Sequence, residues 1–220
     1  MNITLIGTSH LDLDGYNRSK KLLNYLKPSA IGIEDTEEGY KESKEIVKIF
    51  SDPVAVEKAA QKIKGNIKAA NIETLRLLLP TLDYDTRAVA EYYDTNNVLI
   101  IFCEYPEEIK RYTDSLKNHK NLDELMDDFN KFVILTPEEA RNDIKRSYSK
   151  KAYHVSDLPE LVQFYSKRDK FAESVLRQQD GNIVYICGLD HIFGDYYPNL
   201  YDRLVDLSPE RIKLNLADKL

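Results

Sequence analysis

The sequence is poor in cysteine, with only Cys103 and Cys187 among 220 residues. Two cysteines make no disulfide framework, and we expect both to be buried and reduced. If their strands were neighbours, the two thiols could approach each other. No apolar run approaches the length of a membrane span, and no basic and apolar leader precedes the first strand-like segment. We therefore expect a cytoplasmic protein with no membrane-spanning helix and no secretory signal.

An excess of basic residues is also missing. The chain has 31 Lys and Arg against 37 Asp and Glu, which gives a formal net charge of −6. Because phosphate backbones bind basic surfaces, this balance argues against nucleic acid as the main partner. The length allows a sizeable core, and we expect residues 1–220 to form a single domain.

Histidine is scarce, yet two of the four histidines end the same local pattern. Residues 2–10 and 182–191 are runs rich in β-branched residues that each close with Gly-x-x-His, at His10 and His191. Such runs are typical of buried strands in a parallel sheet, where ligands bind at the carboxyl ends of the strands. The repetition favours a shared site, although two unrelated loop histidines would give the same pattern.

The segment after His10 predicts a βαβ unit. Residues 16–27 have helical spacing, and residues 29–34 form a second strand-like run that ends in Glu34. A βαβ unit brings both strand ends to the same edge of the sheet, so Glu34 should lie near His10. Glu34 could instead be a solvated acid that opens the next helix.

A long helical stretch, roughly residues 37–96, comes before the next strand. It is interrupted at turn or proline signals and is longer than one crossover needs. We expect part of it to form a helical cap over the strand ends, where it could gate a substrate. Residues 98–104 form the third strand, which ends in Glu104. That acid has an alternative role as a charge favoured by the N-terminus of the following helix.

The remaining pattern completes the predicted fold. Residues 106–150 predict further helices, and residues 208–216 alternate as an edge strand would. The fold class is therefore α/β, with a mostly parallel central sheet, flanking helices and a helical insertion (cap) over the strand ends. His119 and His154 lie in polar surroundings and are predicted to be surface residues. The basic run 145–151 could contact an anion but is more typical of a solvated loop.

The helix predicted from about residue 159 to residue 179 contains an unexpected charge. At about 100° per residue, Arg168 falls in the middle of its apolar face and Asp169 at the margin. A guanidinium in that position needs an anion, because it cannot lose its charge. The anion could be a buried carboxylate or a carboxylate of the substrate. Alternatively, Arg168 extends past a thin edge of the core to solvent.

These residues define a candidate hydrolytic site. His10, His191 and Glu34 are a sensible ligand set for a divalent transition metal such as Mn, Co or Zn. A metal-bound water would then attack an amide or ester, with Arg168 anchoring a carbonyl or carboxylate. Without a metal, a His–Glu pair could act as general base on water, with Arg168 facing the oxyanion. The sequence leaves both schemes open.

Four motifs in this chain resemble the TraB/PrgY family. They are Ile-Gly-Thr-Ser-His at 6–10, the strand-terminal Glu34, Lys-Arg-Asp-Lys-Phe-Ala at 167–172 and Cys-Gly-Leu-Asp-His-Ile-Phe-Gly at 187–194. The wider superfamily contains the Tiki proteases, the erythromycin esterases and ChaN-like proteins. The resemblance follows the chain from end to end, although segment 37–160 contributes little. Lys167 replaces the acid usual in the family, and the C-terminal membrane helices of some members are missing.

The resemblance implies an α/β core with a helical insertion and a shared site. By position, the implied site residues are His10, His191, Glu34 and Arg168, with Glu104 where related sequences tend to carry an acid. The implied activities include metal-dependent peptide cleavage, hydrolytic ring opening, haem binding and inhibition of a peptide pheromone.

Together, the residues and the resemblance predict a hydrolase, metal-assisted, that acts on a peptide or another amide or ester. In this prediction Glu34, Glu104 and Arg168 are catalytic, His10, His191 and Glu34 are the metal ligands, and Arg168 and Asp190 bind the substrate. The alternative is a binding protein that sequesters a peptide or small ligand in the same pocket without turnover. A haem carrier is a third, weaker option. The oligomeric state stays open, with a homodimer as one option.

Overall fold

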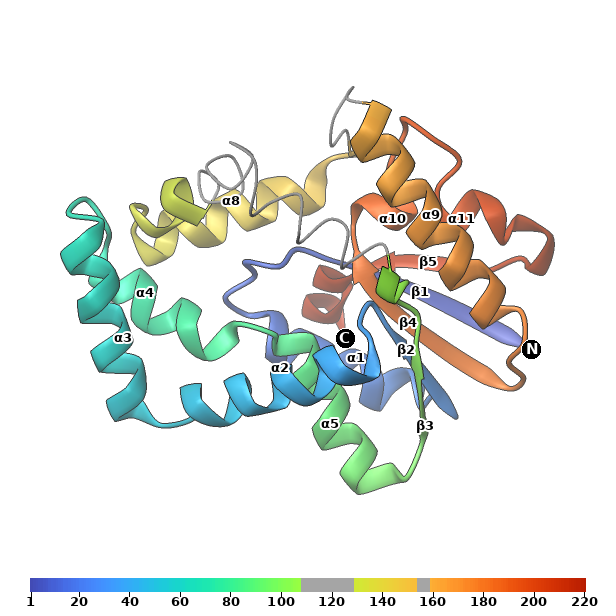
Figure 1. Ribbon diagram of the computed structural model, residues 1–220, viewed down its shortest axis with the longest axis horizontal. Helices are drawn as coiled ribbons and strands as arrows, with labels where there is room; N and C mark the ends of the chain where they lie inside the picture. Colours follow the sequence, from blue (N-terminus) through green and yellow to red (C-terminus); the bar gives the residue numbers. More distant parts are fainter. Residues whose placement is uncertain (108–128, 154–158) are drawn as a thin grey trace.

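The computed structural model describes residues 1–107, 129–153 and 159–220. Within them the chain forms an α/β fold around a parallel sheet of five strands in the order β3-β2-β4-β1-β5 (Figure 1). The strands are β1 (Asn2–Thr8), β2 (Ala30–Ile33), β3 (Leu99–Phe102), β4 (Asn182–Gly188) and β5 (Glu210–Lys213). The predicted fold class is confirmed, and the predicted C-terminal edge strand is β5, beside β1.

The two Gly-x-x-His strands are neighbours. β1 pairs with β4 along its whole length, with Gly7 opposite Cys187 and Thr8 opposite Gly188. On the other side of β4 lies β2, whose Ile33 is opposite Ile186. Parallel pairing places the carboxyl ends of these three central strands at one edge, so the segments that follow them start close together.

Two apolar layers enclose the sheet because alternate strand residues face opposite sides. One layer contains Ile6, Val184 and Ile186 and packs against the N-terminal helices. The other contains Leu5 and Ile183 and packs against the C-terminal helices. Nearly continuous apolar strands are what a parallel sheet covered on both faces requires. The C-terminal side has α9 (Pro159–Leu176), α10 (Asp190–Phe193), α11 (Leu200–Arg203) and the short 3-10 segment η2 (Val205–Leu207). The last 3-10 segment, η3 (Leu214–Lys219), instead contributes Leu214 and Ala217 to the first layer.

The helical stretch between β2 and β3 divides where the sequence predicts. Its described elements are α2 (Glu37–Phe50), α3 (Pro53–Asn66), α4 (Ile72–Leu78), the 3-10 turn η1 (Leu79–Thr81) and α5 (Tyr84–Asn96). The side chains of Thr36, Asp52 and Asn71 accept backbone N–H bonds at the starts of α2, α3 and α4. Figure 1 shows this segment extending away from the sheet, with α8 (Pro137–Ser149) beside it.

Helix α1 (Gly15–Leu26) connects β1 with β2 and packs against α5. Leu22 and Leu23 are fully buried, and the helix ends at Lys27, which is left-handed with φ 47° and precedes Pro28. At the start of α8, Thr136 and Glu139 form a capping box.

The cysteines are buried and free, and their strands are not neighbours, because β2 separates β3 from β4. The condition under which the two thiols could approach each other is therefore not met. The helices predicted between residues 106 and 128 lie largely outside the described residues, as do His119 and His154. Among the described helices, none is both long and apolar enough to cross a membrane.

The contact between α1 and α5 gives a first test of the packing. A Cβ on Gly15 would lie 2.6 Å from two ring carbons of Tyr84, which is only 2% exposed. Because that ring cannot move aside, we expect Gly15→Ala to lower the free energy of unfolding by about 1–3 kcal/mol in urea titrations. The matched variant is Gly65→Ala in α3, where a Cβ would meet nothing within 4 Å. It should raise stability by about 0.5–1 kcal/mol, and equal shifts in both variants would contradict the packing argument.

Candidate active site

Three side chains converge over Gly188, the last residue of β4. A methyl group on Gly188 would lie 3.5 Å from Nε2 of His10, 3.6 Å from Cδ2 of His191 and 3.7 Å from Oε2 of Glu34. The backbone N–H of Gly188 also donates to Oε2 of Glu34 at 2.7 Å. The ends of β1, β2 and β4 therefore bring both motif histidines and the strand-end acid to one place, although the roles predicted for them are not tested by position alone.

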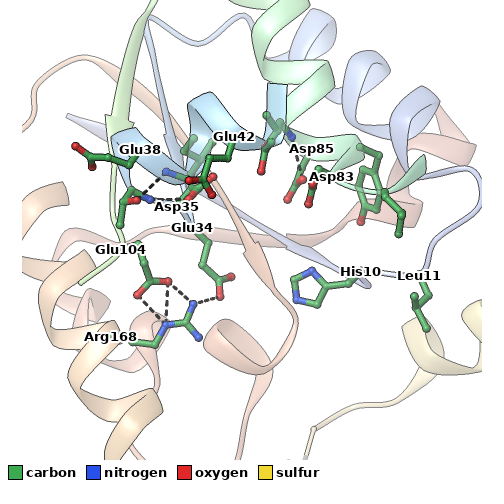
Figure 2. A pocket seen from close by; sticks show the side chains of 17 residues that line it. His10, Leu11, Glu34, Asp35, Glu38, Glu42, Asp83, Asp85, Glu104 and Arg168 are labelled. Atoms are coloured by element: carbon green, nitrogen blue, oxygen red, sulfur yellow. Dashed lines mark hydrogen bonds and ion pairs between the residues drawn. The ribbon is translucent and has the colours of Figure 1, made fainter. Parts of the chain in front are cut away.

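Arg168 of α9 joins this group through two carboxylates. Its Nε donates to Oε1 and Oε2 of Glu104 at 2.8 and 2.9 Å, and its Nη2 donates to Glu104 and, at 2.5 Å, to Oε1 of Glu34. Figure 2 shows the two glutamates converging on the guanidinium. Within the described residues, Nη1 has no hydrogen-bond partner.

Arg168 is nearly buried, with 12% of its side chain exposed, as its place on the apolar face of the helix suggests. Burial alone lowers the pKa of Arg168, but the carboxylates of Glu34 and Glu104 outweigh burial and raise the pKa above its ordinary value. Glu104 also accepts the backbone N–H of Tyr105 at 2.9 Å. The buried cation has its anions inside the protein.

His191 is held between two carboxylates. Its Nδ1 bonds to Asp169, and its Nε2 lies 3.1 Å from Oε1 of Glu34 as an ion pair rather than an aligned hydrogen bond. The second oxygen of Asp169 accepts the hydroxyl of Tyr197 at 2.6 Å. Burial alone lowers the pKa of His191, but Glu34 and Asp169 raise it to about 10. His191 is therefore an imidazolium at neutral pH.

The result is a row of alternating charges that runs through Asp169, His191, Glu34, Arg168 and Glu104. Burial raises the pKa of Glu34, but His191 and Arg168 outweigh burial and lower the pKa well below the ordinary value. The neighbouring charges thereby keep Glu34 ionised and keep Arg168 and His191 protonated. Such a row can hold a geometry but is poorly suited to exchanging protons near neutral pH.

The surroundings of His10 differ from those of His191. His10 is solvent-exposed, and no described residue forms a hydrogen bond with its ring. Figure 2 shows it across the cavity from Arg168, with Asp83 and Asp85 above it.

The cavity at this edge has a volume of about 690 Å³ and an acidic lining. Its carboxylates are Glu34, Asp35, Glu38, Glu42, Asp83, Asp85 and Glu104. Burial, together with Asp83 and Asp85, raises the pKa of Asp35 to about 6. Burial is also the main cause that raises the pKa of Asp83 and that of Asp85. The starts of α2 and α5 supply much of this lining, so part of the helical stretch does lie over the strand ends.

The predicted metal ligands do not form a ready metal site as they are arranged. Among the described residues, no group of three or more His, Cys, Asp or Glu side chains is placed to hold a metal ion. The chemistry of the donors agrees, since His191 carries a proton on each ring nitrogen while Oε1 of Glu34 accepts the Arg168 guanidinium. A ligating imidazole must be neutral, and a second cation at Glu34 would be repelled by Arg168.

Asp190, predicted to bind substrate, is not among the described residues that line the cavity. It opens α10, and its pKa is raised, mainly by burial. Sequence reasoning missed Asp169, which is 1% exposed, because it lies at the margin of the helical wheel. The acids Asp83 and Asp85 were missed as well, since they follow a helix break rather than a strand.

No protein-family model and no curated protein matches this chain.

The charge of His191 predicts a specific pH dependence of stability. Its pKa is raised from about 6.5 in the unfolded chain to about 10 in the folded protein. The stabilisation is therefore complete below pH 6.5 and is lost as the pH rises toward 10. Between pH 6 and pH 9, wild type should lose on the order of 3 kcal/mol more than His191→Gln in urea unfolding.

The matched control for this measurement is His10→Gln, which changes the other motif histidine. This exposed ring has no described hydrogen bond, so the variant should keep the wild-type loss of stability between pH 6 and pH 9. If His191→Gln showed the same loss as wild type, the imidazolium would not be present in the folded protein.

Proposed function

We propose that this protein is a hydrolase that cleaves an amide or ester in the acidic cavity, with His10 as general base. The observation that carries the proposal is the contrast between the two motif histidines. His191 is fixed as a cation by Asp169 and Glu34, whereas His10 is exposed at the cavity without a described hydrogen bond to its ring. Only His10 is then available to take a proton from water.

In the proposed reaction, His10 removes a proton from water as the water oxygen bonds to the substrate carbonyl carbon. The carbonyl electron pair moves to its oxygen, and that oxyanion faces Nη1 of Arg168, the guanidinium nitrogen without a partner among the described residues. When the tetrahedral intermediate collapses, the C–N or C–O bond breaks. The departing amine or alcohol recovers the proton from His10, which is then neutral again.

Glu34 and Glu104 have a supporting role in this scheme, not the catalytic role predicted from the sequence. They hold the guanidinium in place because Arg168 donates three hydrogen bonds to Glu104 and one to Glu34. The backbone N–H of Gly188 donates a further hydrogen bond to Glu34 and fixes that carboxylate. A preorganised cation stabilises developing negative charge without reorganisation during the reaction. The resemblance to the TraB/PrgY family supports the same group of residues as the reacting site.

The charge of the cavity supports a positively charged substrate. Asp83 and Asp85 face the side of the cavity opposite Arg168, and no cation partner for either is found in the described part of the chain (Figure 2). An acidic concave surface attracts cations and repels anions. A peptide with a free amine or a basic side chain fits this lining, whereas haem, with its apolar ring, does not.

The first test uses fluorogenic aminoacyl amides and nitrophenyl esters as probes. Wild type should hydrolyse at least one of these classes, and His10→Gln should reduce kcat/KM by roughly 10²-fold or more, because the variant keeps the size of the side chain but has no general base. Gly65→Ala, in a helix away from the cavity, is the control and should retain full activity. Specific binding of a probe without turnover, unchanged in His10→Gln, would support the alternative of a sequestering protein.

Elemental mass spectrometry of the untagged protein separates the two hydrolytic schemes. The proposed scheme predicts activity that survives chelation and metal well below one ion per chain. Near-stoichiometric Mn, Co or Zn that disappears in the double variant His10→Ala with His191→Ala would contradict it and support the metal-assisted scheme.

The acidic lining predicts a charge preference. Probes with a lysyl group should have a KM roughly tenfold lower than matched glutamyl probes, a difference of about 1.4 kcal/mol in binding. Asp85→Asn should reduce that ratio, and added salt should reduce it further because partly exposed charges are screened. A ratio near one in wild type would show that the cavity does not select its substrate by charge.

A further inference from the structure

The ring of His10 forms no hydrogen bond with a described residue, and yet it lies close to Gly188. A methyl group added to Gly188 would be 3.5 Å from its Nε2. The preceding residue supplies the missing constraint. The N–H of Ser9 donates to the hydroxyl of Tyr148 at 3.2 Å, and the carbonyl of Ser9 accepts the hydroxyl of Tyr84 at 3.0 Å. Both tyrosines are buried, so the peptide before His10 is held from two sides.

Tyr148 is itself fixed by a second hydrogen bond. Its hydroxyl donates to Oδ2 of Asp12 at 2.9 Å, and Asp12 is only 1% exposed. Burial and the nearby charge of Asp12 raise the pKa of Tyr148 above its ordinary value, so the hydroxyl stays protonated and keeps both bonds. The hydroxyl therefore has one possible orientation, accepting from Ser9 and donating to Asp12.

Asp12 is held in turn by Arg18, whose Nη1 lies 2.7 Å from each carboxylate oxygen. The other side of the guanidinium reaches the C-terminal segment. Nε and Nη2 of Arg18 donate to the two oxygens of Asp218 at 2.9 and 2.8 Å. Five residues from three separate parts of the sequence are thereby connected, from the C-terminal 3-10 segment η3 to the backbone beside His10.

We propose that Tyr148, oriented by Asp12, Arg18 and Asp218, is a positioning residue that fixes His10 over Gly188. The inference rests on the proposed role of His10 as general base, but the placement of the ring can be measured without any substrate. Hydrophobic residues of similar volume often match or exceed the stability of a buried ion pair, so stability alone does not account for the Asp12–Arg18 pair. A fixed position for His10 does, because small displacements of a catalytic group cost large factors in rate.

The decisive variant is Tyr148→Phe, which keeps the buried ring and removes the hydroxyl that contacts Ser9 and Asp12. We expect the rate of acylation of His10 by diethyl pyrocarbonate, followed by peptide mass mapping, to change by roughly threefold or more as the backbone is released. With a probe that wild type hydrolyses, kcat should fall by roughly tenfold while KM stays within about twofold, because the ring is displaced but the cavity lining is intact.

The matched control is Tyr153→Phe, which also removes one tyrosine hydroxyl, bonded to the carbonyl of Ser147 instead of to Ser9. It should leave both the acylation rate and kcat near wild type. An unchanged rate at His10 in Tyr148→Phe, or equal changes in the two variants, would overturn the proposal. If both His10→Gln and Tyr148→Phe kept full activity, the role of His10 as general base would be refuted. The acylation rates would still decide whether Tyr148 positions His10.

Asp218→Asn provides a second test in case Tyr148→Phe does not fold. Half of the side chain of Asp218 is exposed, at 51%, so Asp218→Asn should fold normally. This variant weakens the ion pair with Arg18. It should shift the acylation rate of His10 in the same direction as Tyr148→Phe, by a smaller factor. Asp218→Glu keeps the charge and should restore the wild-type rate. If Asp218→Asn and Asp218→Glu behaved alike, the ion pair would not contribute to the position of His10.

Discussion

A buried guanidinium that cannot lose its charge is the constraint on which this site depends. Arg168 lies on the apolar face of α9, where it packs with its cationic carbon 5.0 Å from the centre of the Phe164 ring. In that environment it requires anions from the protein, and Glu34 and Glu104 provide them from the ends of two adjacent strands. Glu34 also contacts a second cation, because its negative charge favours the protonated state of His191. The charge of Arg168 thereby lowers the pKa of Glu34, and Glu34 in turn raises the pKa of His191.

The order of the strands makes this arrangement accessible. With β4 between β1 and β2, the segments that carry His10, His191 and Glu34 leave the sheet side by side, and β3 adds Glu104 at the next position. Gly188 is central to them, because a side chain there would fill the space that the three groups share. The same site could not be formed in a sheet whose two Gly-x-x-His strands were separated, whatever the side chains.

The sequence carries the information for those parts of the site that depend on regular geometry. Strand ends, a βαβ crossover and the periodicity of one helix were enough to predict that Glu34 lies near His10 and that Arg168 needs an anion. The carboxylates of Asp83 and Asp85 could not be predicted in the same way, since their place depends on how a chain of helices folds back over the sheet. Tyr148 was equally hidden, because its contact with Ser9 links residues 139 positions apart through neither a strand pair nor a helix face.

The two Gly-x-x-His motifs show how the tertiary structure gives one local pattern two different surroundings. Both motifs place an imidazole three residues after a strand glycine, so the motif alone predicts equal histidines. After β4 the chain enters α10 and turns under α9, which buries His191 against Asp169 and fixes it as a cation. After β1 the chain enters a loop in which the His10 ring is exposed, while hydrogen bonds constrain the backbone beside it. The proposed reaction depends on this difference, because it uses one histidine as a fixed cation and the other as an accessible side chain, and identical surroundings would provide only one of these.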